Sequence, residues 1–470
     1  MSAAVPGPTP APTTRQMVTA GTASTVGFAF DLFDLFILLY VASTVGPLFF
    51  PTDSPTLTLA ATFASFGVSL VMRPLGGAVF GRYADRHGRK QTMLVTVGGV
   101  GLATAVMGAL PTYATIGVAA PVVFVALRLV QGLFVGGVVA STHTMGTETV
   151  PQRWRGLVSG LVAGGGPGLG AVIASLVFLA VSAMFPGPAF DEWGWRVMFF
   201  TGLLASLASL AFFRLLEESP VWAAAARARA AGTAPEQPAR GRDLLTAVRP
   251  RTLVAAAALV IGAGAQYYLT SGYLPTFLDK INQLPTGARG LLLVWTSLAI
   301  LPIALLAGHA SERFGRRPVF LVTGVVNLVA LPLLALAMGG LGPDDTGALL
   351  GYGLLITVLA NAPIAAVPIF LNELFPTRLR ATATALIWNG GFAVGGLTTT
   401  FVSLASPTVP DIPGRLAVFL AAVVALFLLG AAFAPETRGA LDREDPSDAA
   451  PAPSPTAAAD RPEALPGGLR

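Results

Sequence analysis

Cysteine is absent from the 470-residue sequence, and histidine occurs only three times. Without cysteine the chain can form neither a disulfide nor a metal site built on thiolates, and the redox compartment cannot be read from it. No Walker-type phosphate-binding loop is present, which excludes ATP as an energy source. No nucleophile–base motif or metal cluster is evident in the sequence. We therefore predict neither an enzyme nor a bound cofactor or metal.

Charged residues are also scarce. They make up 11% of the chain, against about a quarter in soluble domains. Hydrophobic residues make up 54%, and the mean hydropathy is +0.70. Apolar runs of about eighteen residues or more recur, each long enough to cross about 30 Å of hydrocarbon. The sequence thus predicts an all-α membrane protein with the lipid bilayer as its partner. We interpret the net charge of +5 as a matter of orientation and not of nucleic-acid binding.

Twelve transmembrane helices are predicted from these runs. Their expected ranges are 18–45, 57–80, 91–110, 115–140, 156–183, 196–214, 252–277, 289–308, 318–338, 347–371, 381–404 and 414–434. The first run is not interpreted as a cleavable signal, because two aspartates interrupt it and only Arg15 precedes it.

Basic residues fall in alternate loops. The loops after the even-numbered spans hold Arg82, Arg86, Arg89, Lys90, Arg153, Arg155, Arg214, Arg227, Arg229, Arg240, Arg242, Arg249, Arg251, Arg313, Arg316, Arg317, Arg378 and Arg380. The other loops are poor in arginine and hold Asp53, Asp191, Glu192, Asp344, Asp345 and Asp411. By the positive-inside rule, both termini face the cytoplasm, and we expect a multi-pass protein of a bacterial inner membrane.

Composition divides the chain into five parts. We predict a cytoplasmic tail at 1–17, a six-helix half at 18–215 and a basic cytoplasmic linker at 216–250. A second six-helix half follows at 251–436, and the Pro/Ala-rich tail at 437–470 is expected to be disordered.

The two halves repeat each other. "GRYADRHGRK" at 81–90 matches "GHASERFGRR" at 308–317, and "ETVPQRWR" at 148–155 matches "ELFPTRLR" at 373–380. The offsets are 227 and 225 residues. Duplicated helical halves predict pseudo-symmetry and alternating access, in which rocking opens a site between the halves to each side in turn.

At these motifs the sequence resembles the major facilitator superfamily. "GRYADRHGRK" is similar to that superfamily's loop between spans two and three, and "RLVQGLFVGG" at 128–137 is similar to its span-four motif. "MRPLGGAVFGRYADRHGRK" and "FDLFDLFILLY" at 30–40 resemble the metabolite:proton symporters, with Asp31 in place of the usual Glu. The resemblance covers roughly residues 18–440 and implies the major facilitator fold, proton coupling and a monomer.

Two departures from the family pattern stand out. Val138 occupies the position where the metabolite symporters usually have a Glu. "AGGGPGLGA" at 163–171 partly resembles the span-five motif of drug antiporters, with Val162 where a Gly is expected.

Asp31 and Asp34 lie on one face of an apolar helix, where each ionised carboxylate costs about 2.5–3.5 kcal/mol. A buried Arg128 needs an anion, so we predict an Asp–Arg pair that couples transport to protons. We do not assign the proton to one carboxylate, because a close pair titrates together. His143 is a candidate proton relay or only a helix cap. A metal site, hydrogen bonding within the span, and Arg128 as a structural anchor remain alternatives.

The resemblance also implies gating residues at the cytoplasmic helix ends. These are Asp85, Arg86, Arg89, Lys90, Glu148, Arg155, Glu312, Arg313, Arg316, Glu373 and Arg380. Asp85 and its basic neighbours would pair across the halves and latch the outward-open state, and the group around Glu312 would be a weaker counterpart. The alternative is that these charges only fix the orientation of the spans.

Polar and aromatic side chains within the spans form a candidate substrate wall. They are Arg128, Gln131, Gln266, Tyr267, Tyr268, Tyr273, Asn361, Trp388 and Asn389. Each alone is more often a helix-packing residue than a ligand-binding one. The glycine clusters at 164–166, 390–391 and 395–396 are expected to serve close helix packing.

Together these features predict a proton-coupled symporter that imports a small carboxylate or zwitterion. One alternative is a drug/proton antiporter, suggested by the partial span-five motif. The other is a membrane sensor that binds a nutrient without moving it.

Overall fold

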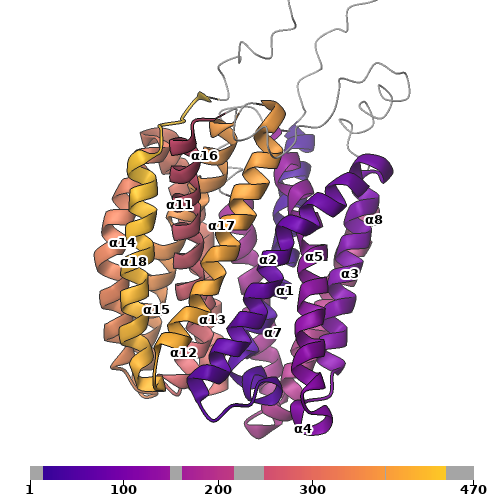
Figure 1. Cartoon of the computed structure of the whole chain (residues 1–470), viewed down its shortest axis with the longest axis vertical. Coiled ribbons are helices and arrows are strands. Elements are labelled where there is room, and N and C mark those ends of the chain that lie inside the picture. The colour runs from indigo at the N-terminus through magenta and orange to yellow at the C-terminus, as the bar shows by residue number, and fades with distance from the viewer. Residues whose placement is uncertain (1–13, 149–160, 216–247, 376, 441–470) are drawn as a thin grey trace, which may run out of the picture.

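The computed structural model describes residues 14–148, 161–215, 248–375 and 377–440, and this part of the chain is built of helices (Figure 1). It contains 12 helices long and apolar enough to cross a membrane, which confirms the prediction of an all-α membrane protein. In Figure 1 the first half of the chain forms the indigo and magenta bundle, and the second half forms the orange and yellow bundle beside it.

The first bundle (the N-half) begins with a long helix that contains both aspartates. Its helices are α1 (Thr14–Phe49), α2 (Pro55–His87), α3 (Arg89–Ala109), α4 (Tyr113–Ile116), α5 (Ala119–Glu148), α7 (Gly166–Met184) and α8 (Trp195–Leu215). Single π-helical turns, η1 (Leu161–Gly165) and η2 (Phe190–Gly194), precede α7 and α8.

The second bundle (the C-half) has two interrupted spans. Its helices are α11 (Pro250–Tyr267), α12 (Leu274–Lys280), α13 (Thr286–Phe314), α14 (Arg316–Gly339), α15 (Thr346–Asn361), α16 (Val367–Leu374), α17 (Thr377–Ala405) and α18 (Ile412–Phe433). The π turn η4 (Tyr268–Gly272) lies between α11 and α12, and the 3-10 turns η5 (Pro363–Ala366) and η6 (Val409–Asp411) precede α16 and α18.

Both interruptions lie beside a proline. Pro275 follows η4 in the first turn of α12, and Pro363 begins η5. Proline has no backbone N–H and its ring clashes with the preceding turn, so a continuous α-helix is disfavoured there. The span predicted at 347–371 is confirmed as Thr346–Leu374, and η5 interrupts its regular α-helix at Pro363.

The internal repeat appears as the same backbone turn in both halves. Gly88, between α2 and α3, has φ 98° and ψ 155°, and Gly315, between α13 and α14, has φ 101° and ψ 159°. Glycine is the residue that adopts such positive φ without strain. The two glycines are 227 positions apart, the offset of the matching motifs.

Close backbone contact joins α2 and α5. A Cβ atom on Gly132 would lie 2.1 Å from the carbonyl oxygen of Ser69, and one on Gly136 would lie 2.0 Å from that of Arg73. Small residues four apart allow helices in a membrane to approach in this way. The contact fixes Arg73 relative to Arg128, which lies one turn before Gly132.

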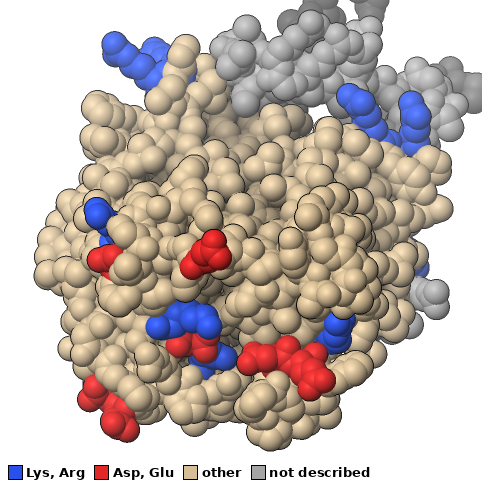
Figure 2. Space-filling view, turned by 60° about the horizontal axis from the view of Figure 1, so that its bottom comes forward, with Lys and Arg blue, Asp and Glu red and all other residues tan. Residues whose placement is uncertain are grey.

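The two halves meet along two helix pairs, with α2 packed against α17 and α7 against α13. We call the bottom of Figure 1 the lower end; it contains the loops 50–54, 110–118, 281–285 and 340–345. The opposite, upper end contains the α2–α3 and α13–α14 turns. Figure 2 shows the lower end, where acidic side chains lie between isolated basic ones.

Candidate functional site

A cavity of about 560 Å³ lies between the two halves. Its lining residues are Leu32, Leu70, Arg73, Gly164, Pro167, Tyr267, Tyr268, Asn361, Ile364, Trp388, Asn389 and Phe392. The first five belong to the N-half, and the other seven belong to the C-half. In the part of the chain that the structure describes, none of these lining residues is acidic.

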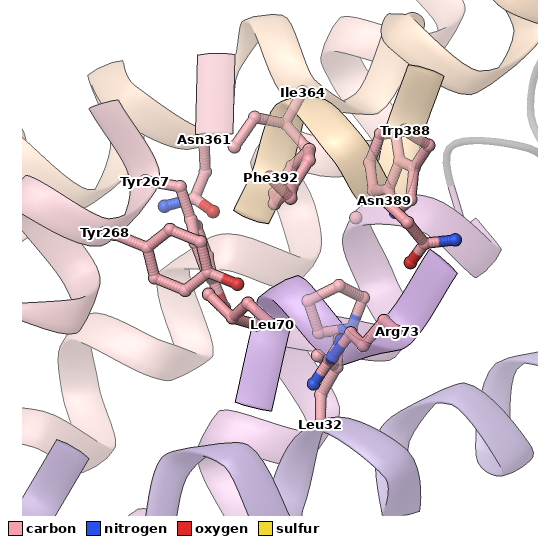
Figure 3. Close-up of a pocket in the computed structure, with 12 residues that line it drawn as sticks. Leu32, Leu70, Arg73, Tyr267, Tyr268, Asn361, Ile364, Trp388, Asn389 and Phe392 are labelled. Atoms are coloured by element: carbon pink, nitrogen blue, oxygen red, sulfur yellow. The ribbon is translucent and has the colours of Figure 1, made fainter. Parts of the chain in front are cut away.

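Arg73 is the charged residue of this lining. Its side chain is 8% exposed, and its Nε atom has no hydrogen-bond partner. Within the described ranges we find no hydrogen bond or ion pair for any atom of Arg73. In Figure 3 the side chain enters the cavity from α2, opposite the residues contributed by the C-half. Because burying an unpaired charge is costly, a buried guanidinium without a partner makes Arg73 a candidate binding residue for an anion.

Aromatic rings form the opposite wall (Figure 3). The rings of Trp388 and Phe392 are stacked, with centroids 4.2 Å apart. Tyr267 and Tyr268 pack edge to face at 5.1 Å, and Phe392 lies 6.2 and 6.1 Å from them. Asn361 is held at this wall because its Nδ2 donates to Ser271 Oγ at 3.0 Å. Aromatic faces attract cations, including quaternary ammonium groups.

Asp34 does not line the cavity and lies in a buried polar network of the N-half. Its carboxylate accepts hydrogen bonds from Thr104 Oγ1 on α3 and, at 2.5 Å, from Gln131 Nε2 on α5. Gln131 Oε1 in turn accepts from Arg128 Nη1 at 2.5 Å. Asp34, Arg128 and Gln131 are 6%, 2% and 1% exposed. The network holds one acid and one base inside the N-half, away from the cavity lining.

This arrangement connects Asp34 to Arg128 indirectly, and the predicted pairing of Arg128 with Asp31 stays a prediction because the Asp31 side chain lies outside the described part. Asp34 and Arg128 share one network, but the amide of Gln131 lies between them, and the described residues include no ion pair between the two. Arg128 instead places its guanidinium over the ring of Phe66, 5.8 Å from the centroid. Gln131, predicted to bind substrate, is used by the network because both ends of its amide are occupied.

Five of the residues predicted for the substrate wall line the cavity: Tyr267, Tyr268, Asn361, Trp388 and Asn389. Gln266 does not, because its Oε1 accepts from Asn327 Nδ2 at 2.9 Å inside the C-half. Tyr273 also lies elsewhere, stacked on Phe63 at 5.0 Å with its Oη 3.1 Å from Ser403 Oγ.

Several predicted residues have side chains outside the described part of the structure. Asp31, Asp85, Arg89, His143 and Glu148 lie on described helices, but nothing is said of their side chains. Arg155 lies outside the described residues altogether. For all six, the predicted roles stay predictions.

Below the cavity, toward the lower end, hydroxyl groups join the two halves. Tyr40 Oη lies 2.8 Å from Ser175 Oγ and 3.5 Å from Ser297 Oγ, and the last two are 3.2 Å apart. Arg289, on α13, lies over the ring of Phe178 on α7 at 5.4 Å and pairs with Asp279. These contacts hold the halves together on this side.

At the upper end the predicted gating residues of the C-half form a cluster within that half. Arg316 is 1% exposed and pairs with Glu312 Oε2 at 2.6 Å and Glu373 Oε1 at 3.0 Å. Arg313 is exposed, with its guanidinium over the ring of Phe314. Arg380 donates to the carbonyl of Asn372 at 2.8 Å.

In the N-half, Arg86 is exposed and Lys90 is half-buried. The latch hypothesis requires ion pairs between the two halves, but the described ion-pair partners of Arg316, Glu312 and Glu373, both lie in the C-half.

Glu436, which follows the upper end of α18, contacts the same cluster. Its carboxylate accepts backbone N–H groups of Arg316, Arg317 and Thr437, each at 3.0 Å, and of Arg438 at 2.9 Å. Burial opposes ionisation of this group, but these donors outweigh it and lower the pKa of Glu436 below its usual 4.5. A Cβ atom on Gly315 would lie 2.6 Å from this carboxylate, so glycine is required there.

A metal site has no support in the described ranges, which contain no group of three or more His, Cys, Asp or Glu residues able to hold an ion. The chemistry available at the cavity is therefore binding by one cation, several aromatic faces and amides.

Known proteins match most of the chain. A model of the Major Facilitator Superfamily matches residues 19–288, and a sugar (and other) transporter model matches residues 233–441. The chain is 30% identical over 422 residues to the inner membrane metabolite transport protein YhjE of Escherichia coli K12, covering 88% of this chain and 93% of that protein. It is 29% identical over 385 residues to the proline/betaine transporter of Salmonella typhimurium LT2, covering 81% and 76%.

Solved structures agree on the fold. The proton:xylose symporter XylE bound to 6-bromo-6-deoxy-D-glucose superposes with a TM-score of 0.69 at 16% identity, covering 90% of this chain and 97% of that one. The inward-open XylE from E. coli gives 0.65 at 18% identity, covering 90% and 97%. With its relatives, which are transporters and not enzymes, this multi-pass inner-membrane protein belongs to the major facilitator superfamily.

Proposed function

We propose that this transporter is a proton symporter that imports a small zwitterion, with a carboxylate at one end and an alkylated ammonium group at the other. The observation that carries the proposal is the unpaired Arg73 on one side of the cavity and the aromatic wall on the other. A carboxylate would pair with Arg73, and the ammonium group would lie against Trp388 and Phe392. The proline/betaine transporters among the relatives carry names that fit this class.

The proton would be carried by Asp34. Its carboxylate is buried, hydrogen-bonded to Thr104 and Gln131, and part of a network with Arg128. A group of this kind can take up a proton on one side of the membrane and release it on the other, provided that its surroundings change as the halves rock. Asp31, one turn earlier, remains a second candidate for the same proton.

The upper end would face the cytoplasm. Exposed basic residues lie there, among them Arg82, Arg86, Arg251 and Arg317, which is the side that the positive-inside rule assigns to the cytoplasm. Since the natural chain has no cysteine, single cysteines at positions 53 and 251 test this directly. A membrane-impermeant maleimide applied to whole cells should label position 53 only; the reverse pattern would invert the topology.

Uptake into proteoliposomes tests the function. Labelled glycine betaine, proline and a panel of plain carboxylates are offered with and without a pH gradient that is acid outside. We expect betaine or proline to accumulate with the gradient and only to equilibrate without it. Accumulation of plain carboxylates alone would move the substrate class to organic acids. Efflux driven by the gradient would indicate an antiporter, and binding without movement a sensor.

The variant Asp34→Asn tests the proton carrier. It should lose accumulation driven by the gradient, while exchange of labelled for unlabelled substrate continues, because the cavity itself is unchanged. Undiminished accumulation in this variant would show that Asp34 is structural, and Asp31→Asn would then be the next variant to measure.

A further inference from the structure

We propose that Arg73 couples substrate binding to protonation of Asp34. It binds the substrate carboxylate, and through its charge it makes protonation of Asp34 depend on whether that carboxylate is bound. The proposal rests on the proposed function and deepens it, because it assigns the step that makes transport obligatorily coupled.

The geometry separates the two sites and leaves one residue facing both. Arg73 lines the cavity, whereas Asp34 and Arg128 do not. The backbone of Arg73 is nevertheless held against α5, where Gly136 packs on its carbonyl oxygen, and this contact keeps its guanidinium within electrostatic range of Asp34 and Arg128. Asp34 is therefore outside the cavity lining, and Arg73 is the charged lining residue that lies near it.

The charged groups around Asp34 can be counted element by element. Arg73 faces it from α2 and Arg128 from α5, while α3 contributes Thr104 and α8 contributes Gly202, neither of which titrates. On α1 itself, Asp31 is the nearest acid, and its side chain lies outside the described part.

The sign of the coupling follows from this count. Among the side chains that the structure describes, two arginines and the ionised Asp34 give a net charge of +1, and protonation of Asp34 raises this sum by one, to +2. A substrate carboxylate on Arg73 is attracted more strongly by the second state than by the first. Because coupling between two binding events is reciprocal, bound substrate must also favour the protonated form of Asp34. Proton and zwitterion thus enter together, which is the condition for symport.

The test compares two probes that share a quaternary ammonium group and differ in the group at the other end. Glycine betaine has a quaternary ammonium group and a carboxylate, whereas choline has the ammonium group and a hydroxyl. Equilibrium binding of each is measured across a pH series in wild type, Arg73→Gln, Arg73→Lys and Asp34→Asn. In wild type, betaine should bind more tightly as the pH falls, by about tenfold or more over the series.

Arg73→Gln should weaken betaine binding by about tenfold or more at acidic pH and abolish its pH dependence. Choline should bind this variant as well as wild type or better, because a repelling charge has been removed. Arg73→Lys, which keeps the charge, should retain the pH trend. Asp34→Asn should bind betaine tightly at every pH.

Two results would overturn the proposal. If Arg73→Gln weakens betaine but leaves its pH dependence intact, Arg73 binds substrate without transmitting charge. If Asp34→Asn, with Arg73 in place, still shows pH-dependent betaine binding, the proton acts elsewhere; this holds even when Arg73→Gln fails to fold. Arg251→Gln, which removes an exposed arginine remote from the cavity, is the matched control and should behave as wild type.

Failure of the proposed function has a different signature. If wild-type protein binds neither betaine nor proline, the proposed substrate class is wrong, and the inference about Arg73 is wrong with it. Wild-type protein that accumulates betaine with the gradient, while Arg73→Gln keeps wild-type pH dependence, rejects only the role of Arg73.

Discussion

The two halves of this transporter carry matching sequence motifs but differ in how they use buried polar groups. In the N-half, charges lie deep in the bundle, at Asp34, Arg73 and Arg128. In the C-half, the corresponding depth holds neutral amides, such as the pair Gln266 and Asn327. The residue 227 positions after Arg73 is Ile300, and the residue 225 positions after Arg128 is Gly353, so the charges have no counterpart at the repeat offsets.

The helices differ in the same sense. The described N-half helices α1, α2 and α5 run without a break through the cavity level, and the N-half has one π turn there, η1, which contains Gly164. In the C-half, two spans are interrupted at η4 and η5. Residues at these interruptions, Tyr268 and Ile364, line the cavity. The comparison suggests that the two halves have different roles: the N-half provides the charged groups, and the C-half provides the shape of the binding cavity.

The largest effect is expected from removing Arg128. Arg128→Gln removes the positive charge from the network that holds the buried Asp34, and leaving a buried charge uncompensated costs about 3–5 kcal/mol. Proton-driven uptake should be lost and the free energy of unfolding reduced. The double variant Asp34→Asn/Arg128→Gln should recover much of the loss, because no stranded charge remains. Thermal unfolding of all four proteins in detergent measures this coupling.

The C-half supplies the control for that cycle. Gln266→Leu breaks a neutral amide pair, and such bonds in membranes average about 0.6 kcal/mol. A Gln266→Leu effect as large as that of Arg128→Gln would remove the distinction between the halves.

A smaller effect is expected from widening the α2–α5 contact. In Gly136→Ala the new methyl group would collide with the carbonyl of Arg73, forcing the helices apart at a cost of about 1–3 kcal/mol. The KM for betaine should rise because Arg73 moves. Gly390→Ala on α17 has no atom within 4 Å of the added group and serves as the matched control. Equal melting temperatures and KM values for the two variants would contradict the packing argument.

A still smaller effect is expected from changing the aromatic wall of the cavity. Phe392→Leu keeps an apolar side chain but removes a ring from the cavity, which should weaken betaine binding by about 0.5–2 kcal/mol. The ratio of accumulation reached with a pH gradient should not change, since the charged network is intact. Phe200→Leu, at a ring 40% exposed on α8, is the control. A change in the accumulation ratio for Phe392→Leu would show that the C-half also takes part in coupling.

Sequence reasoning identified the spans, the duplication and five of the twelve residues that line the cavity, because hydropathy, motif spacing and polarity within the spans encode these directly. It also placed Asp34 and Arg128 in one region, since a buried charge in lipid requires compensation. It could not place Gln131 between them, because the reach of a side chain across three helices depends on their tertiary register. Thr104 carries no local signal at all.

Arg73 was missed for a different reason. It lies in the apolar stretch "VMRPLGG", where the argument applied to Arg128 holds equally well, but it was treated only as part of a family motif. Gln266 shows the opposite error: its polarity suggested a substrate contact, yet Asn327 on α14 satisfies it. One sequence gives the polarity of a buried residue but not the neighbour that satisfies it.

The smallest effect is expected at Glu436, where the C-half keeps its charges at the end of the bundle instead of its interior. Its carboxylate caps the first N–H groups of α14, an arrangement worth about 0.3–1 kcal/mol. Since its pKa is lowered in the folded protein, the stabilisation exists above its usual value of 4.5 and is lost as the pH falls through the lowered one. Glu436→Gln should therefore melt slightly below wild type at neutral pH, and the difference should vanish in acid. A difference that persists in acid would mean that the side chain acts by packing and not by charge, and the contrast with the interior charges of the N-half would weaken accordingly.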